Sequence, residues 1–386
     1  MAHCPVGPMA NISVHQPSNQ TDRMSSLSAF TIFLHGLFSS IGILENLFIL
    51  WVVGLHVRRS VIRIWILNLA ASDLLATASL PFFTLYLARG NTWTLGTTFC
   101  RIHSSIFFLN MFVSGFLLAA ISLDRCLVVL RPVWAQNHRD VQLVGRVCGV
   151  IWASAVVFTI PFYLFRDTID QPNGKVQCYY NYAQFLPTKP FDLGSVCKRR
   201  KEALAFTKLF MSFLIPLLII ILSYVAVNTG LARRGYRRPF RFVRLVVAVV
   251  VSFVLCWAPY HFFFIVEVVT PRGHPAHRLA GKALPIAATI SFLNGVLNPV
   301  LYVFSCPDLC KKIRHSLGAV MESVLAEDLA ELARRRSTAR STARSTARSS
   351  ISTAEIVLKE RSLITASGLK GEAEKKKESL VNSAEN

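Results

Sequence analysis

Seven long apolar stretches constrain this chain of 386 residues more than any other feature of its sequence. A helix of roughly 20 residues crosses a bilayer core of about 30 Å, and only helices or closed barrels satisfy their own backbone groups in lipid. We expect membrane-spanning helices at residues 28–56, 63–88, 98–130, 143–165, 203–231, 241–269 and 282–304. The sequence therefore predicts an all-α membrane protein whose main domain, residues 28–304, is a seven-transmembrane helix bundle.

Composition and charge narrow the class further. Hydrophobic residues make up 53% of the chain and charged residues 16%, whereas a soluble protein carries about 25% charged residues. The first apolar stretch follows a polar segment and has no small-residue cleavage site after it, so we interpret it as a retained helix rather than a signal peptide. The formal net charge of +21 comes mostly from residues beside the membrane and in the C-terminal tail, which predicts no nucleic-acid partner.

The charges of the loops predict the orientation of the chain. Arg and Lys cluster after the first, third, fifth and seventh apolar stretches, and these segments share one side of a seven-helix bundle. The positive-inside rule makes that side cytoplasmic. The N-terminal segment 1–27 is then extracellular, where Asn11 and Asn19 stand in glycosylation sequons. We therefore expect a multi-pass protein of the plasma membrane with an extracellular N-terminus.

The predicted outer side carries cysteines and an unusual number of basic residues. Four cysteines lie there, Cys4, Cys100, Cys178 and Cys197, in an oxidising environment that allows three pairings. A bridge between Cys100 and Cys178 would pin the loop after the fourth stretch over the bundle and leave Cys4 with Cys197. Seven basic residues between positions 166 and 201 could attract an anionic ligand, or they could simply form a solvated loop face.

Polar residues inside the apolar stretches form a second pattern. Each would be costly if it faced lipid, so we expect them to turn inward. Together they would surround a single carboxylate with oxygen atoms, which suits a small cation or ordered waters. The main members are Asp73, Asn110, Ser114, Asn294 and Asn298.

Short motifs in a fixed order indicate a family. "NLAASDLLA" in the second stretch is followed by "LDRC" at the end of the third, "CWAPY" in the sixth and "NPVLY" in the seventh. These motifs resemble those of the rhodopsin-like (class A) G-protein-coupled receptors over residues 28 to about 318. Longer runs such as "WTLGTTFCRIHSSIFFLNMF", "RPVWAQNHR" and "CYYN" resemble the chemoattractant branch of that family.

This resemblance implies roles for several residues. It implies that Cys100–Cys178 is the signature disulfide and that the five polar residues around Asp73 form an allosteric sodium pocket. It also implies an inner switch in which Arg125 leaves Asp124 to contact the G protein. Tyr224 and Tyr302 would then move in behind Arg125. The resemblance places Trp257 beneath the ligand. Cys126 stands where the family usually has tyrosine.

Lys208 is the one cation inside the fifth stretch. It precedes Pro216 by eight residues, about 12 Å along a helix toward the outside. The resemblance implies that Arg166, Tyr180 and Lys208 hold the carboxylate of a lipid mediator, most directly prostaglandin D2. Four more residues are expected along its path: Phe107, Tyr260, His103 and Phe83, with Tyr179 on the covering loop. From the residues alone, Lys208 could instead snorkel to the membrane surface.

The resemblance further implies an inhibitory-type G protein, lowered cyclic AMP, calcium mobilisation and leukocyte chemotaxis. The alternative ligands are a leukotriene, another oxidised fatty acid or an anionic peptide. After the bundle, "FSCPDLCKKIRHSL" predicts a membrane-surface helix at residues 305–322. The tail 323–386 contains the repeat "RRRSTARSTARSTARSS", which favours disorder and contacts with receptor kinases and arrestin.

Other classes of membrane protein fit less well. No nucleophile–base pair or metal cluster has the spacing of an enzyme site, so we expect no enzyme and no cofactor beyond sodium. The sequence has no internal symmetry of the kind that transporters show. A retinal pigment would need a lysine in the middle of the seventh stretch, and "AATISFLNGVLNP" has none.

Overall fold

The fold was analysed in a computed structural model that describes residues 26–171, 174–186, 192–233, 240–271 and 273–305, with only the backbone at 26–28, 240–247, 249 and 302–305. All of these residues belong to one compact unit. Segment 1–25 with Asn11, Asn19 and Cys4, the expected eighth helix beyond Ser305 and the tail 323–386 lie outside the described residues.

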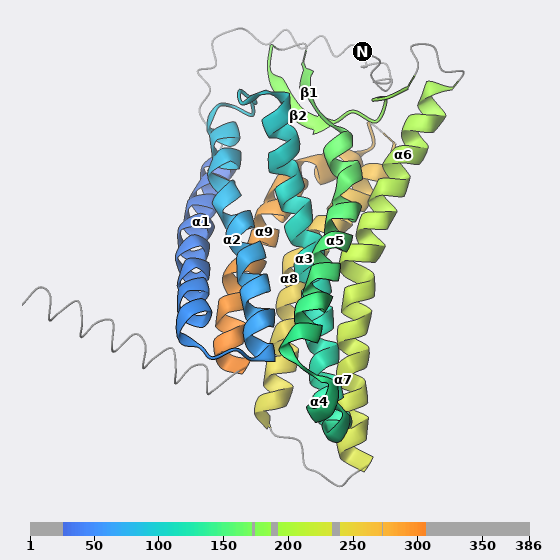
Figure 1. Ribbon diagram of the computed structural model, residues 1–386. Coiled ribbons are helices and arrows are strands. Elements are labelled where there is room, and N and C mark those ends of the chain that lie inside the picture. Colours follow the sequence, from blue (N-terminus) through green and yellow to red (C-terminus); the bar gives the residue numbers. More distant parts are fainter. Residues whose placement is uncertain (1–25, 172–173, 187–191, 234–239, 272, 306–386) are drawn as a thin grey trace, which may run out of the picture. The chain divides into compact units, whose positions relative to one another are not determined.

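Helices make up almost all of this unit (Figure 1). Two of the helical spans contain short π-helical segments, η1 and η2. The elements in chain order are α1 (Ser26–Trp51), η1 (Val52–His56), α2 (Val61–Ala88), α3 (Gly96–Leu130), α4 (Pro132–His138), α5 (Val141–Leu164), β1 (Arg166–Asp170), β2 (Val176–Tyr180), α6 (Leu193–Lys208), η2 (Leu209–Leu214), α7 (Ile215–Arg233), α8 (Phe240–Val269) and α9 (Pro275–Ser305). Within the described residues seven helical spans are long and apolar enough to cross a membrane, as the sequence predicts.

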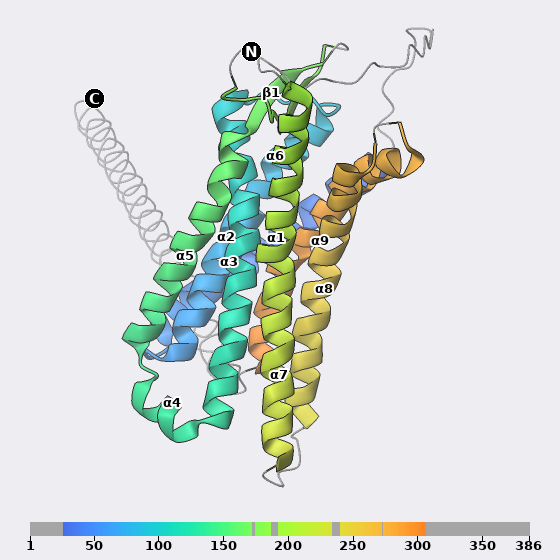
Figure 2. The same ribbon diagram turned by 90° about the vertical axis from the view of Figure 1, so that its right-hand side faces the viewer.

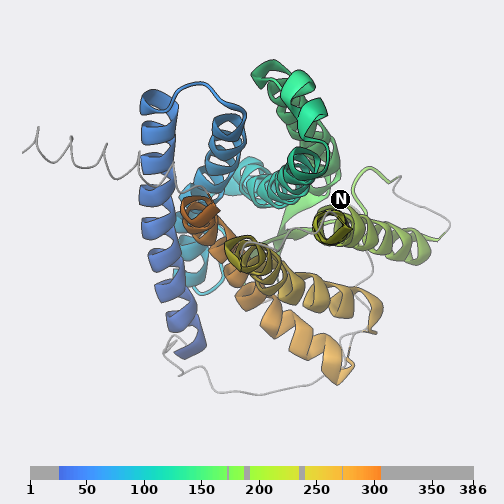
Figure 3. The same ribbon diagram turned by 90° about the horizontal axis from the view of Figure 1, so that it is seen from below.

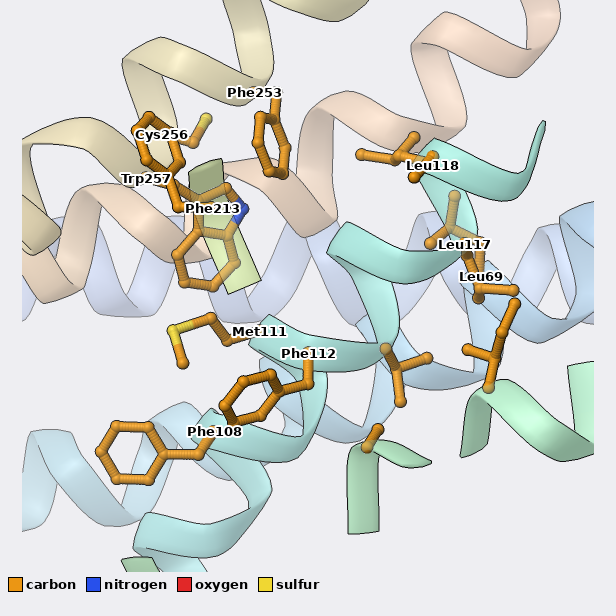
Figure 4. Packing of buried hydrophobic residues seen from close by; sticks show 14 of the residues in the cluster. Leu69, Phe108, Met111, Phe112, Leu117, Leu118, Phe213, Phe253, Cys256 and Trp257 are labelled. Carbon is orange, nitrogen blue, oxygen red and sulfur yellow. The ribbon is translucent and has the colours of Figure 1, made fainter. Parts of the chain in front are cut away.

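Helix α3 is the centre of the bundle. It packs against α2, α5 and α7, and the view from below shows it inside the ring of the other helices (Figure 3). It contributes Phe108, Met111, Phe112, Leu117 and Leu118 to the core, which Figure 4 shows together with Phe213, Phe253 and Trp257. Gly115 brings α3 close to η2, since a Cβ atom there would lie 2.8 Å from the carbonyl oxygen of Ser212.

The fifth membrane span begins earlier than predicted. We expected its start at residue 203, but α6 begins at Leu193 and continues through η2 into α7 as one rod (Figure 2). The Asp192 side chain caps the helix by accepting a hydrogen bond from the Ser195 backbone at 3.0 Å. The basic residues Lys198 to Lys201 are therefore on a helix and not in a loop. Their charges are compatible with a helix because these residues precede the apolar part of the span, which begins near residue 203.

Three smaller features also differ from the sequence-based expectation or add to it. Helix α9 begins at Pro275 rather than at residue 282. The short helix α4 follows α3 and has Pro132 at its first position, where proline's fixed φ favours a helix start. Strands β1 and β2 form an antiparallel hairpin in which Thr168 pairs with Cys178. This hairpin places Arg166 at the start of its first strand.

Candidate functional site

The β1–β2 hairpin lies across one end of the bundle, the end that the sequence predicts to be extracellular (Figure 1). A disulfide between Cys100 and Cys178 ties β2 to the first turn of α3, with the two Cα atoms 5.8 Å apart, which confirms the predicted bridge. The Trp93 backbone N–H donates to the Val176 carbonyl at 2.7 Å, and Lys175 Nζ donates to the Gly90 carbonyl at 2.8 Å. The hairpin is thus fixed as a lid at three points.

A cavity of about 420 Å³ lies beneath this lid. Its walls come from α2, α3, α8, α9 and the hairpin. They are mainly aromatic, with a few polar groups, as is usual for small-molecule sites. The aromatic wall consists of Phe83, Tyr86, Trp93, Phe107, Phe108, Tyr179, Tyr180, Tyr260, Phe264 and Phe292. The polar and charged wall consists of His103, Ser104, Arg166, Gln177 and Glu267.

Arg166 is held in a fixed orientation at the top of the cavity. Its Nε donates to the Ser104 hydroxyl at 2.7 Å, and its guanidinium lies 4.5 Å from the ring centroid of Tyr180 and 5.8 Å from that of Tyr179. Among the described residues, no carboxylate pairs with Arg166 in a salt bridge. The cavity therefore presents a positioned guanidinium that forms no salt bridge with a described residue.

The two tyrosines of the lid differ in their hydrogen bonding. The Tyr179 hydroxyl donates to Glu267 Oε1 at 2.5 Å, whereas the buried Tyr180 hydroxyl has no hydrogen-bond partner among the described residues. Burial is the main cause that raises the pKa of both phenols, and the nearby Arg166 charge opposes the increase. Both side chains are therefore neutral hydroxyls at pH 7. Tyr180 offers an unused donor next to Arg166.

Glu267 is a polar wall residue that the sequence did not single out as a contact. One carboxylate oxygen accepts from Tyr179, and the other, Oε2, is buried without a partner among the described residues. Its backbone carbonyl accepts from Lys201 Nζ at 3.0 Å. The sequence could have indicated Glu267, because it is a carboxylate inside the apolar stretch 241–269. Its presence gives the cavity wall a carboxylate that can accept a hydrogen bond.

Lys208 does not line the cavity. Its side chain is fully buried, which excludes the alternative that it snorkels to the membrane surface. The ammonium donates to the Tyr260 hydroxyl at 2.9 Å and lies 3.0 Å from the ring centroid of Phe264. The other expected ligand residues, Arg166, Tyr180, Phe107, Tyr260, His103, Phe83 and Tyr179, all line the cavity.

The polar residues of the membrane interior converge on Asp73. The fully buried Asp73 carboxylate accepts from the Asn110 amide at 3.1 Å and from the Asn298 amide at 2.8 Å. The Asn294 amide donates to the Ser114 hydroxyl at 2.9 Å. Asp73, Asn110 and Asn298 thus form one hydrogen-bonded group of α2, α3 and α9, and Ser114 and Asn294 form a second pair between α3 and α9. Whether sodium binds there stays a prediction.

The inner switch differs from the expectation in one contact. Asp124 pairs with Arg139, whose Nε and Nη2 donate to its two carboxylate oxygens at 2.5 and 2.8 Å, and not with its neighbour Arg125. Arg139 follows α4, and this short helix turns the chain back toward α3, which brings the guanidinium to Asp124. The Tyr224 side chain hydrogen-bonds to Ser122. Trp257 is buried beside Phe107, below the cavity, and the Tyr302 side chain lies outside the described residues.

The second outer bridge stays a prediction. Cys197 is buried in α6 and is disulfide-bonded, but Cys4, its expected partner, lies outside the described residues. Cys126, Cys148 and Cys256 are free and buried.

Comparison with known proteins agrees with this architecture. The sequence pattern of the family described as "7 transmembrane receptor (rhodopsin family)" matches residues 45–302. The chain belongs to this family of G-protein-coupled receptors. It is therefore a multi-pass receptor of the plasma membrane that has a ligand and a G protein as partners, and it is not an enzyme.

Within this family the chain is similar to one particular receptor. It is 51% identical to prostaglandin D2 receptor 2 of Mus musculus over 84% of each chain. The identity to the receptor of the same name from Rattus norvegicus is 50%, over 84% of this chain and 80% of that one. N-formyl peptide receptor 2 of Homo sapiens is 34% identical over 75% of this chain and 83% of that receptor. The predicted relation to chemoattractant receptors is thereby confirmed.

Proposed function

We propose that this chain is a receptor for prostaglandin D2. It would have its N-terminus outside the cell and signal through an inhibitory-type G protein, lowering cyclic AMP, mobilising calcium and driving leukocyte chemotaxis. The observation that carries the proposal is the pairing of Arg166 with the unused Tyr180 hydroxyl at the top of an aromatic cavity. Similarity to prostaglandin D2 receptor 2 supports the choice of ligand.

The chemistry of the cavity matches an acidic lipid. A carboxylate would accept charge-assisted hydrogen bonds from the guanidinium and a neutral bond from the phenol. The hydrocarbon chain would contact the aromatic wall, and the free oxygen of Glu267 would accept from a hydroxyl group of the lipid. The volume of about 420 Å³ falls in the usual range of roughly 300–1,000 Å³ for small-molecule sites.

A second candidate is a receptor for another chemoattractant, since N-formyl peptide receptor 2 is also related to the chain. Competition binding separates the two ligand classes. On membranes that carry the receptor, labelled prostaglandin D2 should bind saturably, and leukotrienes and formyl peptides should compete only weakly. Agonist should lower cyclic AMP, and pertussis toxin should abolish that response. Equal competition by leukotrienes, or a response that resists the toxin, would contradict the proposal.

The Asp73 cluster leads to a prediction about sodium. Sodium held by Asp73 and the surrounding oxygens would favour the inactive arrangement, because α9 could not move inward past an occupied pocket, and a ligand specific for one state shifts the population. Sodium chloride should therefore weaken agonist binding and leave neutral-antagonist binding nearly unchanged, compared with N-methyl-D-glucamine chloride at equal ionic strength. Asp73→Asn should remove this effect. Agonist affinity that ignores sodium on the unmodified receptor would refute it.

A further inference from the structure

The position of Lys208 raises a question about access. Its ammonium is enclosed by the rings of Phe108, Phe162, Tyr260 and Phe264, whose centroids lie between 3.0 and 5.7 Å from Nζ. Phe108, Tyr260 and Phe264 also line the ligand cavity, whereas Lys208 and Phe162 do not. Aromatic side chains thus lie between the cation and the cavity.

Phe264 makes the closest of these contacts. Its ring centroid is 3.0 Å from Nζ, and the next closest ring, that of Tyr260, is at 4.7 Å. Phe264 lies four residues after Tyr260 on α8, so both side chains project from the same face of the helix. Tyr260 is constrained by the hydrogen bond that Lys208 donates to its hydroxyl. Phe264 has no polar group to fix it and is held by packing in the core, which includes ring contacts with Tyr260 and Tyr180.

The anion that attracts the Lys208 ammonium is Glu267, and it acts only from beyond salt-bridge distance. The described residues place no carboxylate within salt-bridge distance of it. The π-helical segment η2 starts directly after Lys208, and such segments often occur at functional sites. A buried cation held only by a phenol and aromatic faces gains strongly if a carboxylate reaches it.

We infer that Phe264 is a gate between the ligand cavity and Lys208. With the ring in place, the cavity shows one cation, Arg166, to an entering anion. Rotation of the ring into the space of the cavity opens a path to the second cation, Lys208. The inference rests on the proposed function in one respect, since the anion that enters would be the carboxylate of the lipid. It makes Phe264 a specificity-determining residue, because only a ligand that displaces the ring reaches both cations.

Cysteine accessibility tests the gate without any prostaglandin. Lys208→Cys is made in the full chain, once with Phe264 unchanged and once together with Phe264→Ala. Each variant is treated with sodium (2-sulfonatoethyl) methanethiosulfonate, a small anion that forms a mixed disulfide with a thiolate and releases methanesulfinate. Mass spectrometry of the peptide containing residue 208 gives the rate. An open conformer is commonly populated at about 0.1–10%, so removal of the ring should raise the rate roughly ten- to a thousand-fold.

The matched control is Ala288→Cys, at a position that lines the same cavity on α9. Its rate should be the same with Phe264 and with Phe264→Ala. Phe264→Leu keeps a large apolar side chain in the core and should give an intermediate reaction rate at position 208. It controls for the possibility that Phe264→Ala raises the rate by loosening the whole core. The gate is refuted if Lys208→Cys reacts as fast as Ala288→Cys while Phe264 is present, or if neither substitution of Phe264 changes its rate. Because no lipid is used, a wrong ligand assignment would leave this result intact.

Discussion

Arg166→Ala should lower the affinity for prostaglandin D2 more than any other single substitution in the cavity wall. Removal of one partner of a desolvated, hydrogen-bonded charge pair costs about 2–5 kcal/mol, which corresponds to a loss of roughly 30-fold to several thousand-fold. Arg166 is the cation that faces the cavity, and its Nε is already oriented by Ser104. Saturation binding on membranes measures the effect.

Two variants make this result interpretable. Arg166→Lys keeps the positive charge but loses the planar guanidinium that donates to Ser104, so its loss should be intermediate. Arg89→Ala removes an exposed arginine outside the cavity and should leave the affinity unchanged. If Arg89→Ala weakens binding as much as Arg166→Ala, the effect is a general loss of outer positive charge and the clamp is wrong.

Removal of the Cys100–Cys178 bridge should abolish most ligand binding and lower the amount of receptor at the cell surface. The bridge closes a segment with a sequence separation of 78 residues, and the chain-entropy relation gives a stabilisation of about 4.5 kcal/mol for such a loop. It also holds β2, which carries Tyr179 and Tyr180 into the cavity wall. Cys100→Ser with Cys178→Ser tests this by surface immunolabelling and binding capacity.

Two further substitutions serve as comparisons. Cys148→Ala removes a buried free cysteine and should change neither quantity strongly. Cys197→Ala should have a smaller effect than loss of the Cys100–Cys178 bridge, because the expected bridge to Cys4 ties only the N-terminal segment over the bundle. Normal binding capacity in the receptor without Cys100 and Cys178 would show that the lid does not need its anchor.

Much of the fold was predictable because lipid imposes a simple rule on the chain. Each span had to be a long apolar helix, and most predicted ends agree with the structure within two residues. The early start of α6 was missed because four consecutive basic residues were interpreted as a loop. The local signal was present in Asp192 and Ser195, which form the N-cap. The hairpin was missed because each of its strands has only five residues, too few for a clear alternating pattern.

The candidate site was predictable as a set of residues but not as a geometry. Family motifs and polar residues in apolar spans located the wall and the Asp73 cluster. Two contacts depend on tertiary structure alone: Lys208 lies behind Phe264, and Asp124 binds Arg139 rather than Arg125. Side-chain packing between α6 and α8 decides the first. The turn made by α4 decides the second, and neither follows from spacing along the chain.

The account depends most on one interaction, between the Arg166 guanidinium and the carboxylate of the ligand. The most direct measurement compares the affinities of prostaglandin D2 and of its methyl ester for the unmodified receptor and for Arg166→Ala. Esterification removes the charge and leaves the hydrocarbon chain. The ester should bind the unmodified receptor much more weakly than the acid, and the difference should largely disappear in Arg166→Ala. Equal affinities of acid and ester for the unmodified receptor would contradict the account.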